Sequence, residues 1–337
     1  MPQTNFFQLP DIPDIFGLKY RLLNPETDFP GISQVYNTAS PENSELIPQS
    51  ADAVAREYEQ QNPDDRQKQL VVEVDGNIIG WGRYNTYHQR STLTIGDHEF
   101  YVLPEWRSRG IEIPALRYFE AQVSELIRKD QTKEAIYKIF INEAETYRIN
   151  LLKTIGYTQL AAHANMVRPD LENIPDFPLP DGFVIRPAAD EHIREIYETY
   201  REAFQEHIHG SDASEEDFKE WSQASYLADR SLWIVVWDIH TNKIAGVILN
   251  FIVEEENTCF QRNRGYVEFI SVLRAYRGLG LARAMITASL RMYKARGMQE
   301  AALSCHTENP FNPIVLYLKM GFQTRYHTLV LSKPIAL

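Results

Sequence analysis

A glycine-containing segment near residue 280 combines the residue types that bind a phosphate-bearing ligand. Arg277, Gly278 and Gly280 follow an apolar run over 266–272, and apolar residues recur at helical spacing over 281–296. This pattern predicts a strand, a turn and a helix. Such a turn directs backbone N–H groups and the positive end of the helix dipole at one point, where an anion can bind. The glycines allow φ values that other residues avoid, and Arg277 adds a charge suited to a pyrophosphate.

The spacing in this turn separates it from two other phosphate-binding motifs. No Gly-Lys-Ser/Thr follows, as a P-loop requires, and no third glycine follows Gly280 by three residues, as a dinucleotide fingerprint requires. The pattern Arg-x-x-Gly-x-Ala, at Arg277, Gly280 and Ala282, resembles the acetyl-CoA signature of the GNAT N-acetyltransferase superfamily. The pattern is short, so its weight depends on the predicted strand, the predicted helix and a second motif.

The second motif begins at Asn309 and ends at Phe322. It includes the run Leu316-Tyr317-Leu318-Lys319-Met320-Gly321-Phe322. This run resembles the later motif of the same superfamily, an asparagine followed by a helix with Leu-Tyr-x-Lys-x-Gly-Phe. The two motifs come in the family's order, so residues 183–337 are identified as a member of the superfamily. Residues 19–167 resemble it in topology only.

The resemblance implies that acetyl-CoA is the co-substrate and that no metal is needed. In this superfamily, the main chain at the end of the fourth strand holds the acyl-pantetheine arm and polarises the thioester carbonyl. Amides of the turn hold the pyrophosphate, and Asn309 reaches the arm, with helix capping as the alternative role for Asn309. The predicted binding residues are Ile270, Ser271, Val272, Arg277, Gly278, Leu279, Gly280, Leu281, Ala282, Arg283, Asn309 and Asn312.

Two side chains are predicted to move protons. Tyr317 matches a tyrosine of the family motif, which implies a general acid that protonates the departing thiolate; a tyrosine packed on the core is the alternative. An alkylamine is protonated at neutral pH and must lose a proton before attack. Glu268 shares the face of Val272 if side chains alternate, so it is the candidate base, with a solvated strand glutamate as the alternative. His207 and His209 are rival groups, or part of a polar loop.

Composition limits the class of protein. The chain has 337 residues and a net charge of −12, with a pI near 5.3. An acidic surface argues against nucleic-acid and anionic-membrane binding. Two cysteines, Cys259 and Cys305, form no disulfide framework or zinc spacing, so a reducing cytoplasm is expected. We find no run of 18 apolar residues and no signal peptide, so we expect no membrane span.

The predicted elements occur twice in the same order, before and after a proline-rich linker at residues 169–182. The fold class is therefore α/β, with two tandem GNAT-like domains, each a mixed, mostly antiparallel sheet flanked by helices. The N-terminal domain is expected over 1–168 and the catalytic domain over 183–337, a plan similar to that of mycothiol synthase. We also expect a strand over 91–102 with a turn at Gly96, and a solvated loop at 254–256.

The first copy of the signature, at residues 107–112, is degenerate. Ser108 and Glu112 replace the first glycine and the alanine of the signature. A carboxylate in the turn would repel a pyrophosphate. Leu152 stands where the second copy has the candidate acid, and His98 where it has the candidate base. We therefore expect the first copy not to bind acetyl-CoA in the usual way.

The sequence predicts transfer of an acetyl group to a primary amine of a small molecule or peptide, by direct attack in the C-terminal domain. An acyl-enzyme is not expected, because neither cysteine lies in a recognisable nucleophile setting. The alternative is a non-catalytic CoA-binding sensor. The acceptor, the acyl-chain length and the oligomeric state are not predicted.

Overall fold

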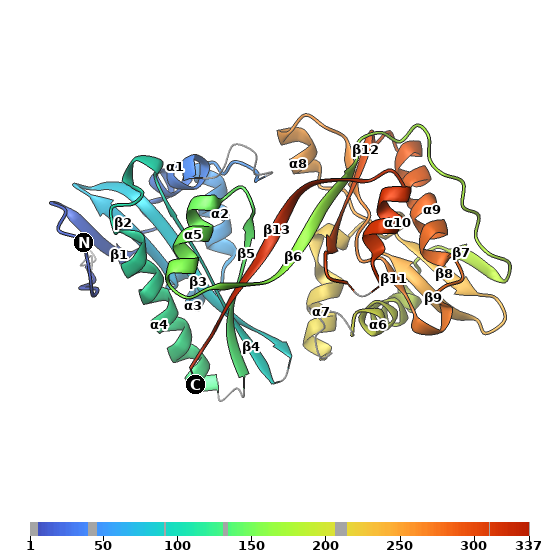
Figure 1. Ribbon diagram of the computed structural model, residues 1–337, viewed down its shortest axis with the longest axis horizontal. Helices are drawn as coiled ribbons and strands as arrows, with labels where there is room; N and C mark the ends of the chain where they lie inside the picture. The colour runs from blue at the N-terminus through green and yellow to red at the C-terminus, as the bar shows by residue number, and fades with distance from the viewer. Residues whose placement is uncertain are drawn as a thin grey trace. The chain divides into compact units, whose positions relative to one another are not determined.

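The computed structural model describes residues 6–39, 46–90, 92–130, 134–205, 214–309 and 311–336. His207 and His209 lie outside the described residues. The chain divides into two compact units (Figure 1). Unit 1 consists of Met1–Leu160 together with Leu329–Leu337, and unit 2 consists of Ala161–Thr328.

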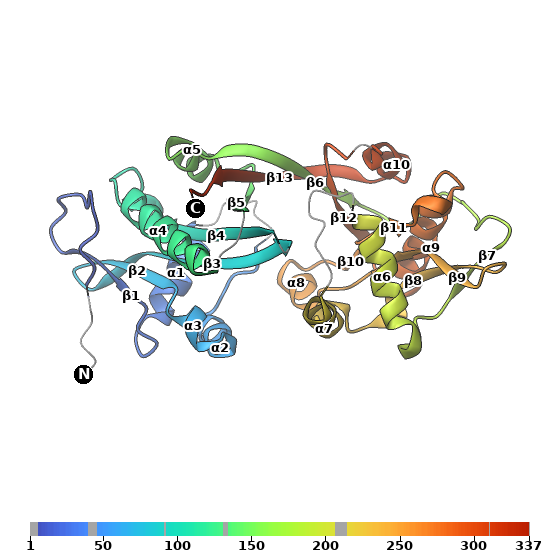
Figure 2. The same ribbon diagram turned by 90° about the horizontal axis from the view of Figure 1, so that it is seen from below.

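Unit 1 is a sheet with helices on both faces (Figure 2). Its strands follow the order β1-β2-β3-β4-β5, antiparallel except for the parallel pair β4–β5. The strands are β1 (Leu18–Leu22), β2 (Gln69–Val74), β3 (Asn77–Arg90), β4 (Leu93–Val102) and β5 (Glu134–Asn142). The helices are α1 (Phe29–Ala39), α2 (Ala51–Gln60), α3 (Pro63–Arg66), α4 (Glu112–Asp130) and α5 (Thr146–Thr154).

The expected turn at Gly96 was wrong. β4 runs through Gly96 without interruption, and a Cβ at this position would overlap Cγ1 of Val123 on α4. The glycine therefore serves a close approach between strand and helix, not a reversal of the chain. The hairpin at Asp75-Gly76 is present, with φ of 49° and 81° at its two residues, as a two-residue turn between twisted strands requires.

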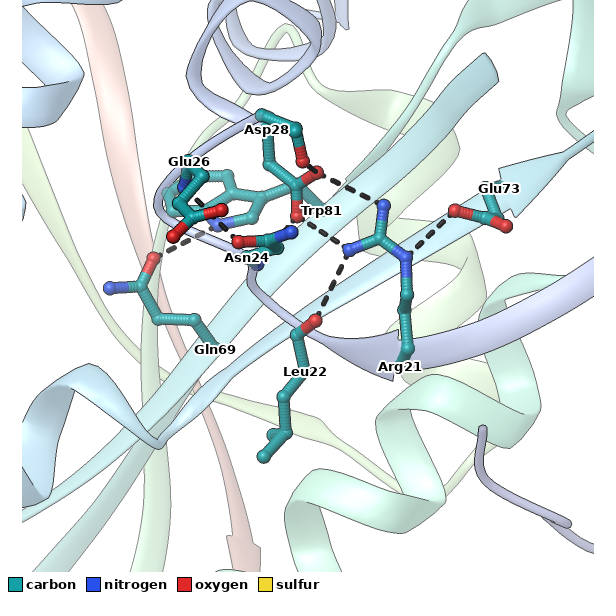
Figure 3. Close-up of polar contacts among 9 residues, drawn as sticks. Arg21, Leu22, Asn24, Glu26, Asp28, Gln69, Glu73 and Trp81 are labelled. Atoms are coloured by element: carbon teal, nitrogen blue, oxygen red, sulfur yellow. Dashed lines mark hydrogen bonds and ion pairs between the residues drawn. The ribbon is translucent and has the colours of Figure 1, made fainter. Parts of the chain in front are cut away.

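A buried ion-pair cluster joins β1, β2 and the start of α1 in unit 1 (Figure 3). The Arg21 guanidinium donates to both carboxylate oxygens of Asp28, at 2.5 and 3.0 Å, and to Glu73 at 2.7 Å. Asp28 also accepts the backbone N–H of Asn24 at 2.7 Å. All three charged side chains are buried, and each has a partner, which a charge removed from water requires.

Unit 2 contains the second set of elements. The strands are β7 (Phe183–Arg186), β8 (Ile234–Asp238), β9 (Lys243–Ile248), β10 (Arg264–Tyr266), β11 (Ser271–Val272) and β12 (Glu300–His306). The helices are α6 (Ile193–Phe204), α7 (Glu215–Gln223), α8 (Glu254–Cys259), α9 (Leu281–Ala295) and α10 (Pro313–Lys319). Successive residues of β8 and β9 are buried, so both faces of this sheet are covered.

The residues expected to form a solvated loop at 254–256 form the first turn of α8, although Glu254 and Glu255 are exposed, as expected. Glutamates are favourable there, since they lie at the positive end of the helix dipole. Glu256 has a further role, because its carboxylate accepts a hydrogen bond from the Tyr266 hydroxyl at 2.5 Å and pairs with Arg262.

Two long strands, β6 (Thr158–Arg168) and β13 (Gln323–Pro334), contribute residues to both units. In unit 2, residues 163–168 of β6 pair antiparallel with β12. In unit 1, Leu331 and Ile335 lie in the core, and Ile335 donates its N–H to Ala135 at 3.1 Å. The compact units therefore differ from the sequence-based boundaries over 161–168 and 329–337.

The proline-rich segment 169–182 contains no helix or strand and belongs to unit 2. It packs along α9. Leu171 is buried in the core of unit 2, and the carbonyl of Pro175 accepts a hydrogen bond from Thr287 at 3.2 Å. Asp176 and Glu172 form ion pairs with Arg291 and Lys294 on the same helix.

Candidate active site

The signature turn of unit 2 has the backbone that its glycines predict. Gly278 and Gly280 have φ of 81° and 88°, and Gly280 is the N-cap of α9. The first helical hydrogen bond runs from Ala284 N to Gly280 O, at 3.3 Å. Within the described part of the chain, the amides of residues 278–283 donate to no acceptor. A Cβ at Gly278 would have no atom within 4 Å, so a ligand can approach these amides closely.

Arg277 does not point into this turn. Its Nε donates to the Val272 carbonyl at 3.2 Å, its Nη2 lies 3.5 Å from the Ala203 carbonyl at the end of α6, and its guanidinium lies over the ring of Phe311. The side chain therefore fastens the turn to β11 and to a helix C-terminus, where a cation is favourable. Arg283 is the cation beside the amides, because a Cβ at Gly280 would lie 2.9 Å from its Nε.

The same clamp occurs in unit 1, where Arg107 Nη2 donates to the Ala39 carbonyl at the end of α1, at 2.9 Å. Sequence reasoning missed this role. The signal was available, because the arginine is present in both copies although only one copy has the intact turn. Because Arg107 is present in the turn that has lost the phosphate motif, its role there is not phosphate binding.

The strand before the turn is interrupted by a β-bulge. Val267 N donates to Ala302 O at 2.8 Å, the last hydrogen bond that continues the β10–β12 pairing. Phe269 then adopts a φ of 53°. The pairing with β9 shifts by one residue between the Phe251–Tyr266 bridge and the Ser271–Val247 pair. The chain thus leaves β12 while it remains paired with β9 and the residues that follow β9, and this separates β11 from β12 at the site.

The bulge corrects the placement of Glu268. Glu268 lies between β10 and β11, so strict alternation from Val272 does not apply. Its carboxylate instead accepts the backbone N–H of Ser304 on β12, at 2.7 Å. This side-chain bond takes the place of a backbone hydrogen bond to β12 beyond the end of the β10–β12 pairing. Removal of this carboxyl from water raises its pKa to about 8, although hydrogen bonds from the amides of Ser304 and Phe269 act in the opposite direction.

The predicted main-chain contacts on β11 are not equivalent. Leu273 N donates to Ala245 O at 3.0 Å, and Ser271 pairs with Val247. Because hydrogen-bonded and non-bonded pairs alternate in an antiparallel ladder, the N–H of Val272 points away from β9, toward the separated strand. Ser271 is committed to the sheet by the same argument. Val272 is therefore the β11 residue whose amide is placed to bind a ligand.

Tyr317 lies near enough to Glu268 for the charge of that carboxyl to raise the pKa of Tyr317. Its side chain is 7% exposed. Burial raises the pKa of Tyr317 well above its usual value, and charges on Cys305 and Glu268 raise it further. Burial and the charge of Glu268 likewise raise the pKa of Cys305 to about 12. Cys305 is therefore a protonated, buried thiol on β12, as the sequence indicated, and not a nucleophile.

The two asparagines of the second motif shape the backbone before α10. The Asn309 side-chain oxygen accepts the N–H of Phe311 at 3.0 Å, and its main-chain oxygen accepts the N–H of Asn312 at 2.8 Å. This is a turn-forming role, which differs from the helix capping named as the alternative for Asn309, because the N-cap of α10 is Asn312. Asn312 is the N-cap of α10, with a φ of 44° and no side-chain capping bond.

The turn of unit 1 has the same backbone but its own anion. Ser108 and Gly110 have φ of 60° and 81°. The Glu112 carboxylate, which is buried at the start of α4, accepts the Tyr147 hydroxyl, and that hydroxyl accepts the N–H of Ser108 at 2.8 Å. In this turn the Tyr147 phenol, held by Glu112, therefore occupies the amide of Ser108, whose counterpart at Gly278 has no acceptor in the described part of the chain.

The rest of the first copy lacks the acid and the base. The N–H of Tyr157 bonds to the carbonyl of Leu152 at 3.1 Å, just as the N–H of Phe322 bonds to the carbonyl of Tyr317 at 3.0 Å. Leu152 therefore occupies the structural position of Tyr317. Burial lowers the pKa of His98 to about 3, and its Nε2 lies 2.7 Å from the Tyr157 hydroxyl, so this histidine is a neutral core residue.

In the described ranges, no group of three His, Cys, Asp or Glu side chains is placed to hold a metal ion. The helices found in those ranges are also too short or too polar to cross a bilayer.

Comparisons with known proteins agree with this architecture. The model of the Acetyltransferase (GNAT) family matches residues 32–111 and 193–322, one region in each half of the sequence. The chain belongs to this family. It is similar to the N-alpha-acetyltransferase MAK3 of Arabidopsis thaliana, with 26% identity over 102 residues, which is 30% of this chain and 46% of the relative. The chain thus spans less than half the length of the curated relatives it matches.

Solved structures show the two-copy fold over nearly the whole chain. A GCN5-related N-acetyltransferase from Sphaerobacter thermophilus superposes with a TM-score of 0.74 and 21% identity, covering 97% of this chain and 98% of that one. A tandem GNAT protein from the clavulanic acid biosynthesis pathway superposes with a TM-score of 0.62 and 14% identity, covering 95% and 99%. At these identities the likeness establishes the fold, and function depends on the site.

Proposed function

We propose that this protein is an acetyl-CoA-dependent N-acetyltransferase whose active site lies in unit 2. The observation that supports this most directly is the open turn at the start of α9, with free amides at residues 278–283. In the corresponding turn of unit 1, the amide of Ser108 is already bonded to Tyr147, and the buried carboxylate of Glu112 holds that phenol in place. Of the two copies, unit 2 therefore has the cradle that fits a pyrophosphate.

The residues around the turn would hold the rest of the cofactor. The Val272 N–H faces the side from which β12 has separated, which suits the amides of a pantetheine arm. Arg283 lies over the ring of Phe177 at 5.1 Å and beside Gly280, so it supplies charge to the phosphates. Bound acetyl-CoA supplies an activated thioester, and the remaining chemistry belongs to the side chains of the protein.

Glu268 and Tyr317 are suited to opposite proton transfers. Glu268 has a pKa of about 8, which is close to the pH at which the enzyme must take a proton from the attacking amine. A general base is most effective when its pKa lies near the working pH. Tyr317 keeps its proton at any ordinary pH because burial and the nearby acidic groups raise its pKa. It can therefore hold a proton for the leaving sulfur, while Glu268 takes one from the attacking amine.

The acceptor is an amine, and the relatives suggest which amines to test first. The curated relative described above is named an N-alpha-acetyltransferase, so the α-amine of a peptide is one candidate class. A small-molecule primary amine is the other. The net charge of −12 favours a cationic acceptor of either class through long-range attraction.

The test is release of free CoA thiol from acetyl-CoA by the full-length protein, with a panel of peptide α-amines, lysine side chains and small primary amines. Amine-dependent thiol release by wild type, lost in Gly280→Glu, is the expected result. Tight CoA binding in calorimetry with no turnover on any amine would instead indicate a CoA-binding sensor and would contradict the enzymatic proposal.

A further inference from the structure

The hydrogen bonds that close the C-terminus of α10 do not include the carbonyl of Met320. Gly321 N donates to Leu318 O and Phe322 N to Tyr317 O, both at 3.0 Å. These two bonds close the helix in a Schellman motif, with Gly321 in the left-handed conformation at a φ of 86°. The carbonyl of Met320 is not used by the motif. Whatever binds that carbonyl acts on the helix that contains Tyr317.

Arg168 binds it. Its Nη1 donates to the Met320 carbonyl, and its Nη2 donates to the Asn173 carbonyl at 2.9 Å. Arg168 is 5% exposed, at the end of β6. A Cβ on Gly321 would overlap the guanidinium. The glycine therefore both permits the left-handed turn and leaves room for the arginine.

The positive charge of Arg168 also lies at the C-terminus of α10. In the part of the chain that the structure describes, no carboxylate forms an ion pair with it. Its hydrogen-bond acceptors are main-chain carbonyls, one of them at the C-terminus of α10. A buried cation needs such compensation, and the negative end of a helix provides it. The position of α10 is thus coupled to a residue from the first half of the sequence.

Unit 1 offers a matched counterpart without the chemistry. Lys333, near the end of β13, approaches Gly156 at the end of α5, where a Cβ would lie 3.7 Å from its Cε. Lys333 pairs with both oxygens of Glu120, at 2.9 and 2.8 Å. The helix beside it contains Leu152 where α10 contains Tyr317. Lys333 therefore lies beside the end of α5 as Arg168 lies beside the end of α10, but Lys333 pairs with a carboxylate, and α5 has a leucine where α10 has the candidate proton donor.

We propose that Arg168 is a positioning residue for Tyr317. It fixes the C-terminal turn of α10 and, through it, the distance between the phenol and Glu268. The proposal rests on the proposed function of unit 2, because it assigns Arg168 a role in the proton transfer that Tyr317 performs. It also predicts that residues 183–337 are not a complete catalytic domain, since Arg168 lies outside them.

A double-mutant cycle in the full-length protein tests the coupling. We expect Arg168→Ala to lower kcat roughly tenfold with the KM for acetyl-CoA within about twofold, and Arg168→Lys to restore part of the loss. In a Tyr317→Phe background, Arg168→Ala should have no further effect, because the group it positions is absent. Equal losses in both backgrounds, or no loss in either, would overturn the proposal.

Hydrogen exchange supplies a second measurement that needs no turnover. Arg168→Ala should speed amide exchange over residues 313–322, whereas Lys333→Ala, the control, should leave that segment unchanged. Unchanged exchange over α10 in Arg168→Ala would overturn the positioning role even if the enzyme is active. If wild type consumes no acetyl-CoA while exchange responds as expected, the proposed function fails and the structural coupling stands. If the alanine variant does not fold, Arg168→Lys is measured in the same two ways.

Discussion

Two acidic groups with raised pKa values lie in unit 2, and burial is the largest cause of both shifts. Glu268 loses water on its carboxyl, while its partners are backbone amides. Tyr317 is buried more deeply, and ionisation of the neighbouring acidic groups would raise its pKa further. A phenol beside a carboxylate keeps its proton, whereas the carboxylate remains available to accept one. The residues therefore differ in role because their environments differ.

Replacement of Tyr317 by phenylalanine removes the hydroxyl and keeps the packed ring. We expect kcat to fall about a hundredfold, as for loss of a general acid, with CoA affinity nearly unchanged. Steady-state kinetics and calorimetry measure the two quantities. Leu152→Ala, in the equivalent position of unit 1, controls for damage to packing alone. Wild-type turnover in Tyr317→Phe would remove Tyr317 from the reaction.

Glu268 gives a pH dependence with a definite sign. As a base it must be ionised, so kcat should rise with pH until about pH 8, where its pKa lies. Glu268→Gln should lower kcat and abolish this limb. For stability, the folded state holds this proton above the pH at which an unfolded glutamate loses it, so wild type loses stability between about pH 4.5 and 8 relative to Glu268→Gln. If the denaturation midpoints of wild type and Glu268→Gln change with pH in the same way across this range, the raised pKa of Glu268 is contradicted.

At the scale of elements, the strand-turn-helix segment occurs once in each unit, and the two copies of its turn differ in their hydrogen bonds. Both turns place an arginine clamp on a helix C-terminus, at Ala39 in one unit and Ala203 in the other. Both adopt left-handed φ at two positions. The turns differ at the first amide, because the N–H of Ser108 bonds to Tyr147, which Glu112 holds, whereas the N–H of Gly278 has no acceptor among the described residues. The geometry of the segment therefore persists without its ligand.

Gly280→Glu places a carboxylate at the open turn, and Gly110→Glu places one at the same point of the degenerate turn. Both glycines have φ near 80–90°, so the backbone strain of the two variants is similar, about 1–2 kcal/mol. We expect Gly280→Glu to abolish CoA binding and Gly110→Glu to leave it unchanged. Calorimetry on the full-length variants decides. Loss of binding in Gly110→Glu alone would move the cofactor site to unit 1.

At the scale of the whole molecule, neither half of the sequence builds a complete unit. Residues 161–168 complete the β12 edge in unit 2, with Ala164 and Met166 in its core. Residues 329–337 return to unit 1, where Leu331 is fully buried. The exchanged strands explain why the compact units cross the boundary that the repeat suggests.

A fragment of residues 161–328 should therefore be more stable than one of residues 183–328. The shorter fragment lacks the β6 pairing and three core side chains, Ala164, Met166 and Leu171. Loss of a single buried methionine or leucine costs about 2–5 kcal/mol, so we expect at least that difference in the free energy of unfolding. Urea denaturation followed by circular dichroism measures it. Equal midpoints would show that unit 2 does not need residues 161–182.

The sequence by itself determined the order of elements and the repeat, and it predicted the chemistry of the second signature. Local periodicity located most helices and strands, because buried faces require apolar residues at fixed spacing. The glycines of the open turn and the carboxylate of the degenerate one were also visible, since φ preference and charge belong to the residue type. The expectation for Asn309 and the choice of base remained open.

The tertiary structure decided what depends on contacts distant in sequence. The bulge at Phe269 moved Glu268 out of simple alternation, and only the pairing with β9 and β12 reveals it. The roles of Arg277 and Arg168 depend on carbonyls supplied by Ala203 and Met320. The contribution of β6 and β13 to both units depends on which strands pair with them. The sequence of a strand specifies its partner only weakly, because the backbone hydrogen bonds of a sheet are the same for every residue.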